Sequence, residues 1–296
     1  MKFNFFSIVL VAFSTFIIGC SDNNDNKNDF GRLTVNLTDA PFPHDLVAEA
    51  NVTVFKVEAR YKGGLELGAQ AIDSNPATMK TEQGNHFVIL MEEEVQVNLL
   101  DLTNGITKNL VDTEVPAGYY DLIRVYVRGV NVVLTNGTTY DLKVPSGAQS
   151  GIKIFIKPGL EVKGGLSADL LLDFDVSSSF VAKGNSEDLN NITGFNFKPV
   201  IKASNLSTAG TLMGVISEIK DDAAVGVEGA QVAIFAADTL NTTTFSDVAG
   251  SYMIMGLDAG SYTIEVEKEA YLKQTTQEVQ INAGNKTVKD FELVLE

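Results

Sequence analysis

Apolar residues recur at every second position along most of the chain. Leu, Val and Leu alternate with polar residues over 33–37, and three Ile recur at every second position over 152–156. Successive side chains of a β-strand point to opposite faces of a sheet, so this period of two is typical of strands with one buried face. No segment carries the sustained 3.6-residue period of a long helix, and only a short helix near 186–191 is expected. The pattern therefore predicts an all-β fold.

Turn residues divide the predicted strands into two groups. Asn136-Gly137 lies between two strand-like runs, which predicts a hairpin with a type I′ turn. Small polar residues at 204–210 place a domain boundary there, and 296 residues are enough for about two domains. We expect two β-sandwich domains in tandem, at 30–205 and 209–296. The short strands expected in the second domain span about 211–219, 229–236, 241–246, 250–255, 261–267, 275–282 and 287–295.

The N-terminus has the features of a secretory signal. A basic residue precedes an apolar run over 3–18, which is shorter than the ~20 residues of a membrane span. The sequence Ile-Ile-Gly-Cys at 17–20 resembles the bacterial lipobox, which implies cleavage before Cys20 and diacylglycerol on its sulfur. The alternative is a buried thiol in an uncleaved helix, but the apolar run stops at Cys20. We therefore expect residues 1–19 to be a cleaved lipoprotein signal peptide.

Residues 20–29 are expected to form a lipidated cysteine followed by a tether rich in Asn and Asp. No apolar side chain occurs in 21–29, so this stretch cannot join a core. Fully extended, it would span about 30 Å at ~3.3–3.6 Å per residue. Ser21 and the acidic residues after it resemble the export signal of surface lipoproteins in the Bacteroidetes. The resemblance implies a lipid-anchored protein of the outer membrane with its body exposed at the cell surface.

The charge balance restricts the partners. Acidic residues outnumber basic residues 38 to 22, which gives a net charge of −16. Binding to nucleic-acid phosphates needs clustered Lys and Arg, so no nucleic-acid partner is expected. With only His44 and His86, a His-rich metal site is disfavoured, and the absence of Trp weakens a sugar-binding face built on indole rings. Eight Tyr remain available for stacking.

Gly- and Tyr-containing turns recur in the last third of the chain. The motifs lie at 210–216, 227–232, 246–252, 256–264 and 270–271. Together they resemble the carboxypeptidase regulatory-like family, a transthyretin-type sandwich, over 209–296. The resemblance implies a structural or accessory module without a catalytic centre. Ala270 occupies a position where the family has Gly, and this difference affects the expected geometry of the turn but not the expected fold.

The larger region carries a second set of motifs. They lie at 31–41, 116–120, 144–147, 151–154, 172–175 and 197–201. They resemble an uncharacterised family of exported proteins, the domain of unknown function numbered four-three-eight-two. The resemblance implies an all-β domain in a lipoprotein setting and no established activity.

Three carboxylates share one face of a predicted strand. Asp169, Asp173 and Asp175 are separated by even numbers of residues and alternate with apolar residues. Aligned carboxylates supply the oxygen ligands that Ca²⁺ prefers, so these residues form a candidate metal site. The alternative is a solvated face opposite the core, which the lack of an Asp-rich loop with a Gly turn favours.

Four further features are candidates for a functional role, but none of them indicates which ligand would bind. Asp39 precedes Ala40-Pro41 at a strand end, where it makes a turn or, alternatively, contacts a ligand. The Gly- and Ser-rich loop at 144–152 lacks the spacing of a nucleophile elbow and a recognisable His base. The acidic run at 92–94 is expected to be a solvated turn. The irregular segment 62–85 is our first candidate for a ligand-facing loop.

These observations predict a non-enzymatic surface lipoprotein that acts as a binding or adhesion module. Its expected partners are the membrane, through Cys20, and a glycan, a protein or a component of an uptake complex. One alternative is an exported hydrolase that uses Asp169, Asp173 or Asp175 at a metal or acid–base site, because paired carboxylates can come from distant positions. Another is a structural spacer or assembly subunit without a ligand.

Overall fold

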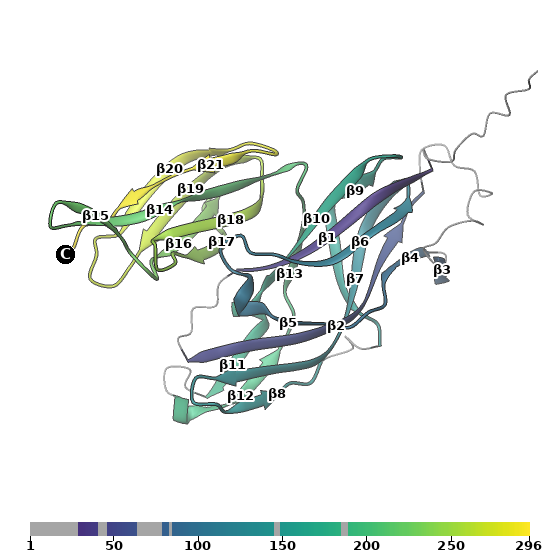
Figure 1. Ribbon diagram of the computed structural model, residues 1–296, viewed down its shortest axis with the longest axis horizontal. Coiled ribbons are helices and arrows are strands. Elements are labelled where there is room, and N and C mark those ends of the chain that lie inside the picture. The colour runs from purple at the N-terminus through teal and green to yellow at the C-terminus, as the bar shows by residue number, and fades with distance from the viewer. Residues whose placement is uncertain (1–28, 41–45, 64–78, 83–84, 145–148, 185–188) are drawn as a thin grey trace, which may run out of the picture.

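The computed structural model describes residues 29–40, 46–63, 79–82, 85–144, 149–184 and 189–296, which form 22 strands and three short helices (Figure 1). The prediction of an all-β chain is confirmed. The expected signal peptide, Cys20 and His44 lie outside the described residues. In the part of the chain that is described, no helix is long and apolar enough to cross a membrane.

Two sheets enclose the core of the N-terminal domain. The first sheet has the strand order β13-β10-β1-β6, with β1 parallel to β10 and antiparallel to β6. Its strands are β1 (Phe30–Ala40), β6 (Lys108–Pro116), β10 (Ser167–Asp175) and β13 (Ile201–Asn205). The second sheet has the order β3-β4-β2-β7-β8, with β5 added to β2 and β9 added to β7. Its strands are β2 (Val47–Tyr61), β3 (Met79–Glu82), β4 (Asn85–Met91), β5 (Val95–Asn98), β7 (Gly118–Leu134), β8 (Thr139–Asp141) and β9 (Ile152–Val162).

Short elements complete this domain. They are α1 (Val176–Ser179), the hairpin strands β11 (Phe180–Gly184) and β12 (Ile192–Phe197), and the 3₁₀ helices Leu99–Leu102 and Leu189–Asn191. The side chains that alternate inward from both sheets form one apolar cluster, in which Leu33, Val57 and Leu160 are fully buried. The alternating pattern of the sequence therefore faces inward as expected, because each strand has one face on this core.

The C-terminal domain is a sandwich of two smaller sheets. One sheet has the order β15-β14-β18, with β21 and β22 also paired to β14, and the other has the order β17-β16-β19-β20. Its strands are β14 (Ala209–Lys220), β15 (Ala223–Gly226), β16 (Gln231–Ala236), β17 (Thr239–Phe245), β18 (Ser251–Asp258), β19 (Gly260–Glu267), β20 (Gln274–Ile281), β21 (Lys286–Val288) and β22 (Phe291–Glu292). A second apolar cluster, from Leu212 to Leu293, fills the space between these sheets. Since both clusters begin after Phe30, a chain that starts at Ser21 retains both cores.

Three local predictions are corrected by the structure. The strand expected at 287–295 is divided into β21 and β22, and β15 was not predicted. Asn136-Gly137 does join two paired strands, but only Gly137 of this pair has a positive φ, at 84°. The amide of Gly137 donates to the carbonyl of Leu134, so the turn is of type I followed by a left-handed glycine, not type I′. The short helix expected near 186–191 is seen as the 3₁₀ helix Leu189–Asn191, with 185–188 outside the described residues.

Candidate functional site

The three aligned carboxylates of β10 lie at the junction between the two domains. Asp169, Asp173 and Asp175 are half-buried on one face of the strand, as the spacing predicts. Leu171 shares that face and is 0% exposed, although it belongs to neither domain core. A Cβ on Gly256 of β18 would lie 3.3 Å from Leu171 Cδ2, which places this face against the C-terminal domain. The alternative of a fully solvated face is therefore wrong, because residues of the C-terminal domain lie against it at Leu171 and Asp173.

The structure does not bring the three carboxylates together as a metal site. Asp175 is the N-cap of α1, where its carboxylate accepts hydrogen bonds from Ser178 N at 2.8 Å and Ser177 Oγ at 2.7 Å. Among the described residues, no group of three or more His, Cys, Asp or Glu side chains is placed to hold a metal ion. The described side chains thus do not assemble the candidate calcium site at Asp169, Asp173 and Asp175.

Asp173 instead shares a small pocket with Asp39. Asp39 Oδ1 accepts a hydrogen bond from Val176 N at 3.1 Å, whereas Oδ2 is buried and has no hydrogen-bond partner among the described residues. The partner lies 137 residues away, so Asp39 does not act through the local turn that the sequence suggested. With 5% of its surface exposed, Asp39 is one of the most deeply buried acidic residues described.

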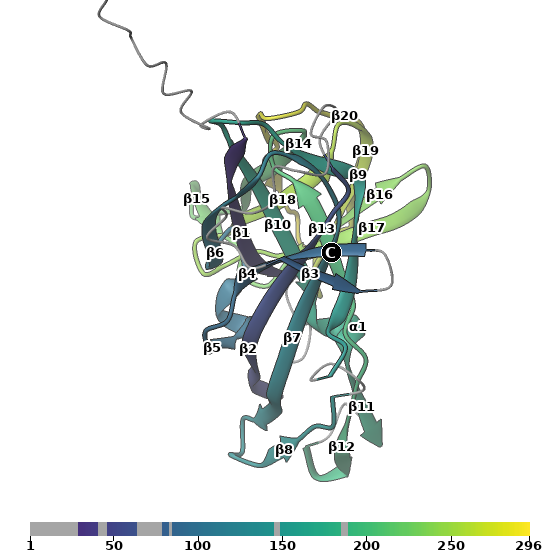
Figure 2. The ribbon, with the colours of Figure 1, turned by 90° about the vertical axis from the view of Figure 1, so that its right-hand side faces the viewer.

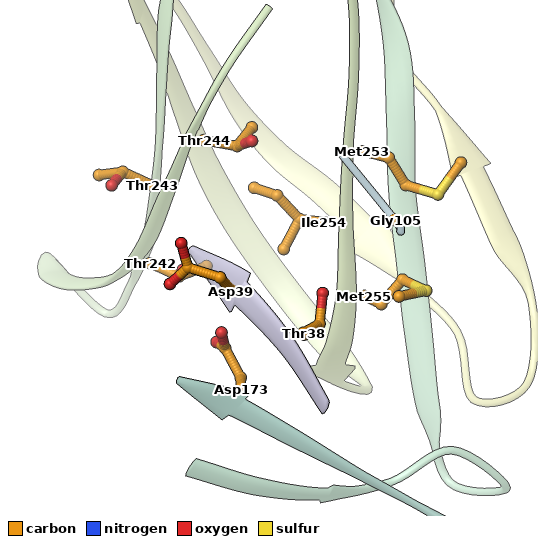
Figure 3. Close-up of a pocket in the computed structure, with 10 residues that line it drawn as sticks. All are labelled: Thr38, Asp39, Gly105, Asp173, Thr242, Thr243, Thr244, Met253, Ile254 and Met255. Atoms are coloured by element: carbon orange, nitrogen blue, oxygen red, sulfur yellow. The ribbon is translucent and has the colours of Figure 1, made fainter. Parts of the chain in front are cut away.

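Both domains line this junction pocket (Figure 3). Thr38, Asp39 and Asp173 come from the N-terminal domain, and 242–244 and 253–255 come from β17 and β18. Its volume of about 20 Å³ has room for about one water molecule. It is far smaller than the ~300–1,000 Å³ of a typical ligand pocket, so neither a sugar ring nor a peptide fits.

Burial sets the electrostatics of the junction pocket. It raises the pKa of the Asp39 carboxyl well above its usual range, because the charged form loses its hydration. The nearby carboxylates of Asp173 and Asp175 raise this pKa further, and the hydrogen bond from Val176 N opposes the shift. The carboxyl of Asp39 is therefore held in its neutral form over a wider pH range than an exposed Asp.

Hydrogen bonds and close packing join the two domains around this pocket. Ser204 Oγ donates to the carbonyl of Gly256 at 2.9 Å, and Thr244 Oγ1 donates to Asn104 Oδ1 at 3.2 Å. Gly105, with φ of 80°, packs so closely on Met253 that a Cβ would overlap the sulfur. The junction therefore includes apolar contacts and paired polar groups from several strands.

A second feature of the junction is an open trough along the edge strands β9 and β13, which run next to each other (Figure 2). We define the trough as two adjoining hollows whose linings meet at Lys157-Pro158 and at Ser204-Asn205. The first hollow, of about 410 Å³, is lined by 153–155, Lys157 and 201–204 together with residues of the C-terminal domain. The second, of about 440 Å³, is lined by 158–161 and 205–208 among others. Both volumes fall in the range of ligand-binding pockets.

The other candidates from the sequence lie elsewhere. Glu92 and Glu94 are exposed and pair with Lys56 and Arg128, which suits the expected surface turn. Most of the segment 62–85 and residues 145–148 lie outside the described residues.

Sequence reasoning did not single out the trough. Lys153, Phe155 and Lys157 alternate with the three Ile of 152–156, which places them on the outer face of β9, and an apolar Phe on this otherwise charged face is the signal that the sequence offers. Their neighbour β13 comes from the other sheet, so their proximity could not be read from strand spacing.

Comparison with known proteins identifies both regions. Residues 215–294 match the carboxypeptidase regulatory-like domain, and no curated protein matches the chain. Solved structures with similar regions include a chain of a type II cohesin–X-dockerin complex from Acetivibrio cellulolyticus, at 20% identity and a TM-score of 0.24, with 29% of this chain and 58% of that chain covered. A putative carbohydrate binding protein from Bacteroides uniformis matches at 17% identity and a TM-score of 0.25, with 29% and 41% covered. The minor pilin GBS52 from Streptococcus agalactiae matches at 10% identity and a TM-score of 0.26, with 89% and 96% covered.

The first two of these structures are covered over less than two thirds of their length, and TM-scores below 0.5 are too low to carry their functions over to this chain. The family description at 215–294 is that of a regulatory-like domain, and the one at 30–199 gives no function. The family match at 30–199, described as a domain of unknown function, DUF4382, covers more than half of the sequence, and the chain therefore belongs to this family.

Proposed function

We propose that this chain is a lipid-anchored, non-enzymatic binding protein of the outer membrane, with its ligand-binding surface at the domain junction. Cys20 is the proposed anchor, and residues 21–29 are the tether that carries the body into the surroundings of the cell. The sequence resemblances at 17–21 support both the lipid anchor and the location at the outer membrane. The ligand in this proposal is a glycan or a protein.

The observation that carries the proposal is the contrast between the junction pocket and the trough. Asp39 and Asp173 have the electrostatics of an acid–base pair, because one carboxyl is buried beside another. Their pocket has space for about one water and no space for a substrate. The trough is open and large enough for a ligand, and it includes no pair of this kind. The junction geometry thus favours binding over hydrolysis.

Two measurements test the proposal. Cys20→Ser is expected to release the protein from the membrane fraction, while the matched control Ser21→Ala remains in it. The chain that starts at Ser21 is expected to bind at least one member of a glycan and protein panel saturably, without turnover. Membrane pelleting of Cys20→Ser would contradict the anchor. Turnover would favour the hydrolase, and loss of surface assembly with no ligand in the panel would favour a structural subunit.

A further inference from the structure

The trough concentrates positive charge in a strongly acidic protein. Lys153 and Lys157 lie on the outer face of β9, and Lys202 lies on β13 across the first hollow. Among the described residues, neither Lys153 nor Lys157 makes an ion pair, and Lys202 donates to the carbonyl of Asn241. One carboxylate, of Asp258, lines the same hollow. The second hollow adds Lys163 and Glu161, which pair with each other. The first hollow therefore carries an excess of two positive charges in a chain with a net charge of −16, which favours an anionic ligand.

Aromatic rings accompany these charges. Phe155 lies between Lys153 and Lys157 on the same face of the strand and is 55% exposed. Tyr119, which is 40% exposed, lines the second hollow. An exposed ring offers a flat apolar face to a ligand, and the neighbouring lysines supply charge-assisted hydrogen bonds. Neutral hydrogen-bonding groups, such as Ser204 and Asn205, line the opposite side.

The shape of the trough suits an extended ligand. Its wall runs along β9 from Lys153 to Val162, whose partners on β7, Arg124 and Gly118, are six residues apart, which at ~3.3 Å per strand residue corresponds to about 20 Å. A single small anion would occupy a fraction of this length. Spaced lysines and two aromatic rings fit a chain of repeating units better than one isolated group.

The edge of β9 argues against a peptide that adds to the sheet as a strand. Strand addition needs a regular row of free backbone groups. The pairing of β9 with β7 is interrupted between the partners of Tyr120 and Leu122, and Pro158 lies within the interruption. A proline and a bulge are devices that block strand addition at an edge. The outer face of β9, rather than its edge, is therefore the recognition surface.

We propose that the trough binds a segment of an acidic polysaccharide, with uronate carboxylates at Lys153, Lys157 and Lys202 and a sugar face against Phe155. This inference rests on the proposed binding function and adds the chemical class of the ligand. It requires no covalent step, so the polysaccharide leaves the trough unchanged.

Calorimetric titration of the chain from Ser21 with oligogalacturonates tests the inference. We expect saturable binding that weakens as salt is raised, because exposed charges are screened within ~10 Å at 0.1 M salt. The double variant Lys153→Ala/Lys157→Ala is expected to bind at least tenfold more weakly, and Phe155→Ala severalfold more weakly. The control double variant Lys183→Ala/Lys220→Ala removes the same charge from exposed positions outside the trough and is expected to bind as the parent does.

The possible outcomes distinguish a failure of the proposed ligand class from a failure of the proposed binding function. Equal affinity of the two double variants, or absence of oligogalacturonate binding, overturns the inference. Equal affinity for a poly-glutamate peptide of matched charge also overturns it, because the trough would then recognise charge alone. If neutral glycans or proteins bind while oligogalacturonates do not, the proposed binding function stands without this ligand class. Turnover of any panel member removes the proposed function itself.

Discussion

Replacing Asp39 by Asn tests the electrostatics of the junction pocket. One oxygen of the native carboxyl is buried without a partner in the described part of the chain, and the pKa of this carboxyl is raised by burial and by two neighbouring carboxylates. Asn has nearly the same shape, retains an oxygen for the Val176 amide and carries no charge. The substitution therefore removes the cost of ionising a buried group while it preserves the packing around that group.

The sign of the pH effect follows from the raised pKa. An Asp in the unfolded chain titrates near its ordinary value of about 3.9. Since the folded pKa is higher, the contribution of Asp39 to stability is fully present below about 3.9 and is lost as pH rises through the folded pKa. The parent and Asp39→Asn should therefore be equally stable at acidic pH, and their difference should grow toward neutral and alkaline pH.

The size of this difference can be bounded. A buried polar group without a partner costs about 1–3 kcal/mol, and an ionised group costs more. We expect Asp39→Asn to raise the free energy of unfolding by at least ~1 kcal/mol at pH values above the folded pKa, or Tm by about 2–4 °C for a domain of this size. Urea unfolding from acidic to alkaline pH measures it, with the exposed Asp141→Asn as the matched control. Parallel pH profiles of the parent and Asp39→Asn would refute the reasoning.

Two further substitutions probe how the domains are joined. Leu171→Ala opens a cavity at a fully buried junction position and should lower the free energy of unfolding by about 2–5 kcal/mol. Calorimetry of this variant should resolve separate transitions for the two domains. The control Leu272→Ala, at an exposed position, should leave the calorimetric scan unchanged. Gly105→Ala places a Cβ against the Met253 sulfur at a positive φ and should destabilise the chain by about 1–3 kcal/mol. Thermal unfolding measures it, with Gly63→Ala as a control that has a positive φ and open space; equal losses in both variants would show that strain rather than domain contact is responsible.

Local patterns were sufficient to predict an all-β chain and many of its strands, although β15 was missed. The alternation over 33–37 and 152–156 reports directly on which face of a strand is buried. The turn at Asn136-Gly137 was placed correctly, but its type depends on the number of loop residues, which strand register decides. The presence of a strand can thus be predicted from the sequence more easily than the geometry of a turn.

The content of the junction could not be predicted, because alternation does not say what covers the outer face of a sheet. Asp173 has the spacing of a solvated face, yet residues of the C-terminal domain line the pocket beside it. One sequence signal was present: Leu170, Leu171 and Leu172 form an apolar run that breaks the alternation and requires burial on both faces. The partner of Asp39 lies 137 residues away, and the trough joins edge strands of two sheets. Such contacts arise from topology rather than from sequence spacing.

A crystal structure of the chain from Ser21 with a bound oligogalacturonate would test the central claim most directly. The account predicts an intact oligosaccharide along β9, with carboxylates at Lys153 and Lys157 and a sugar ring on Phe155. A cleaved oligosaccharide beside Asp39 and Asp173, or a trough that stays empty at saturating ligand, would contradict it.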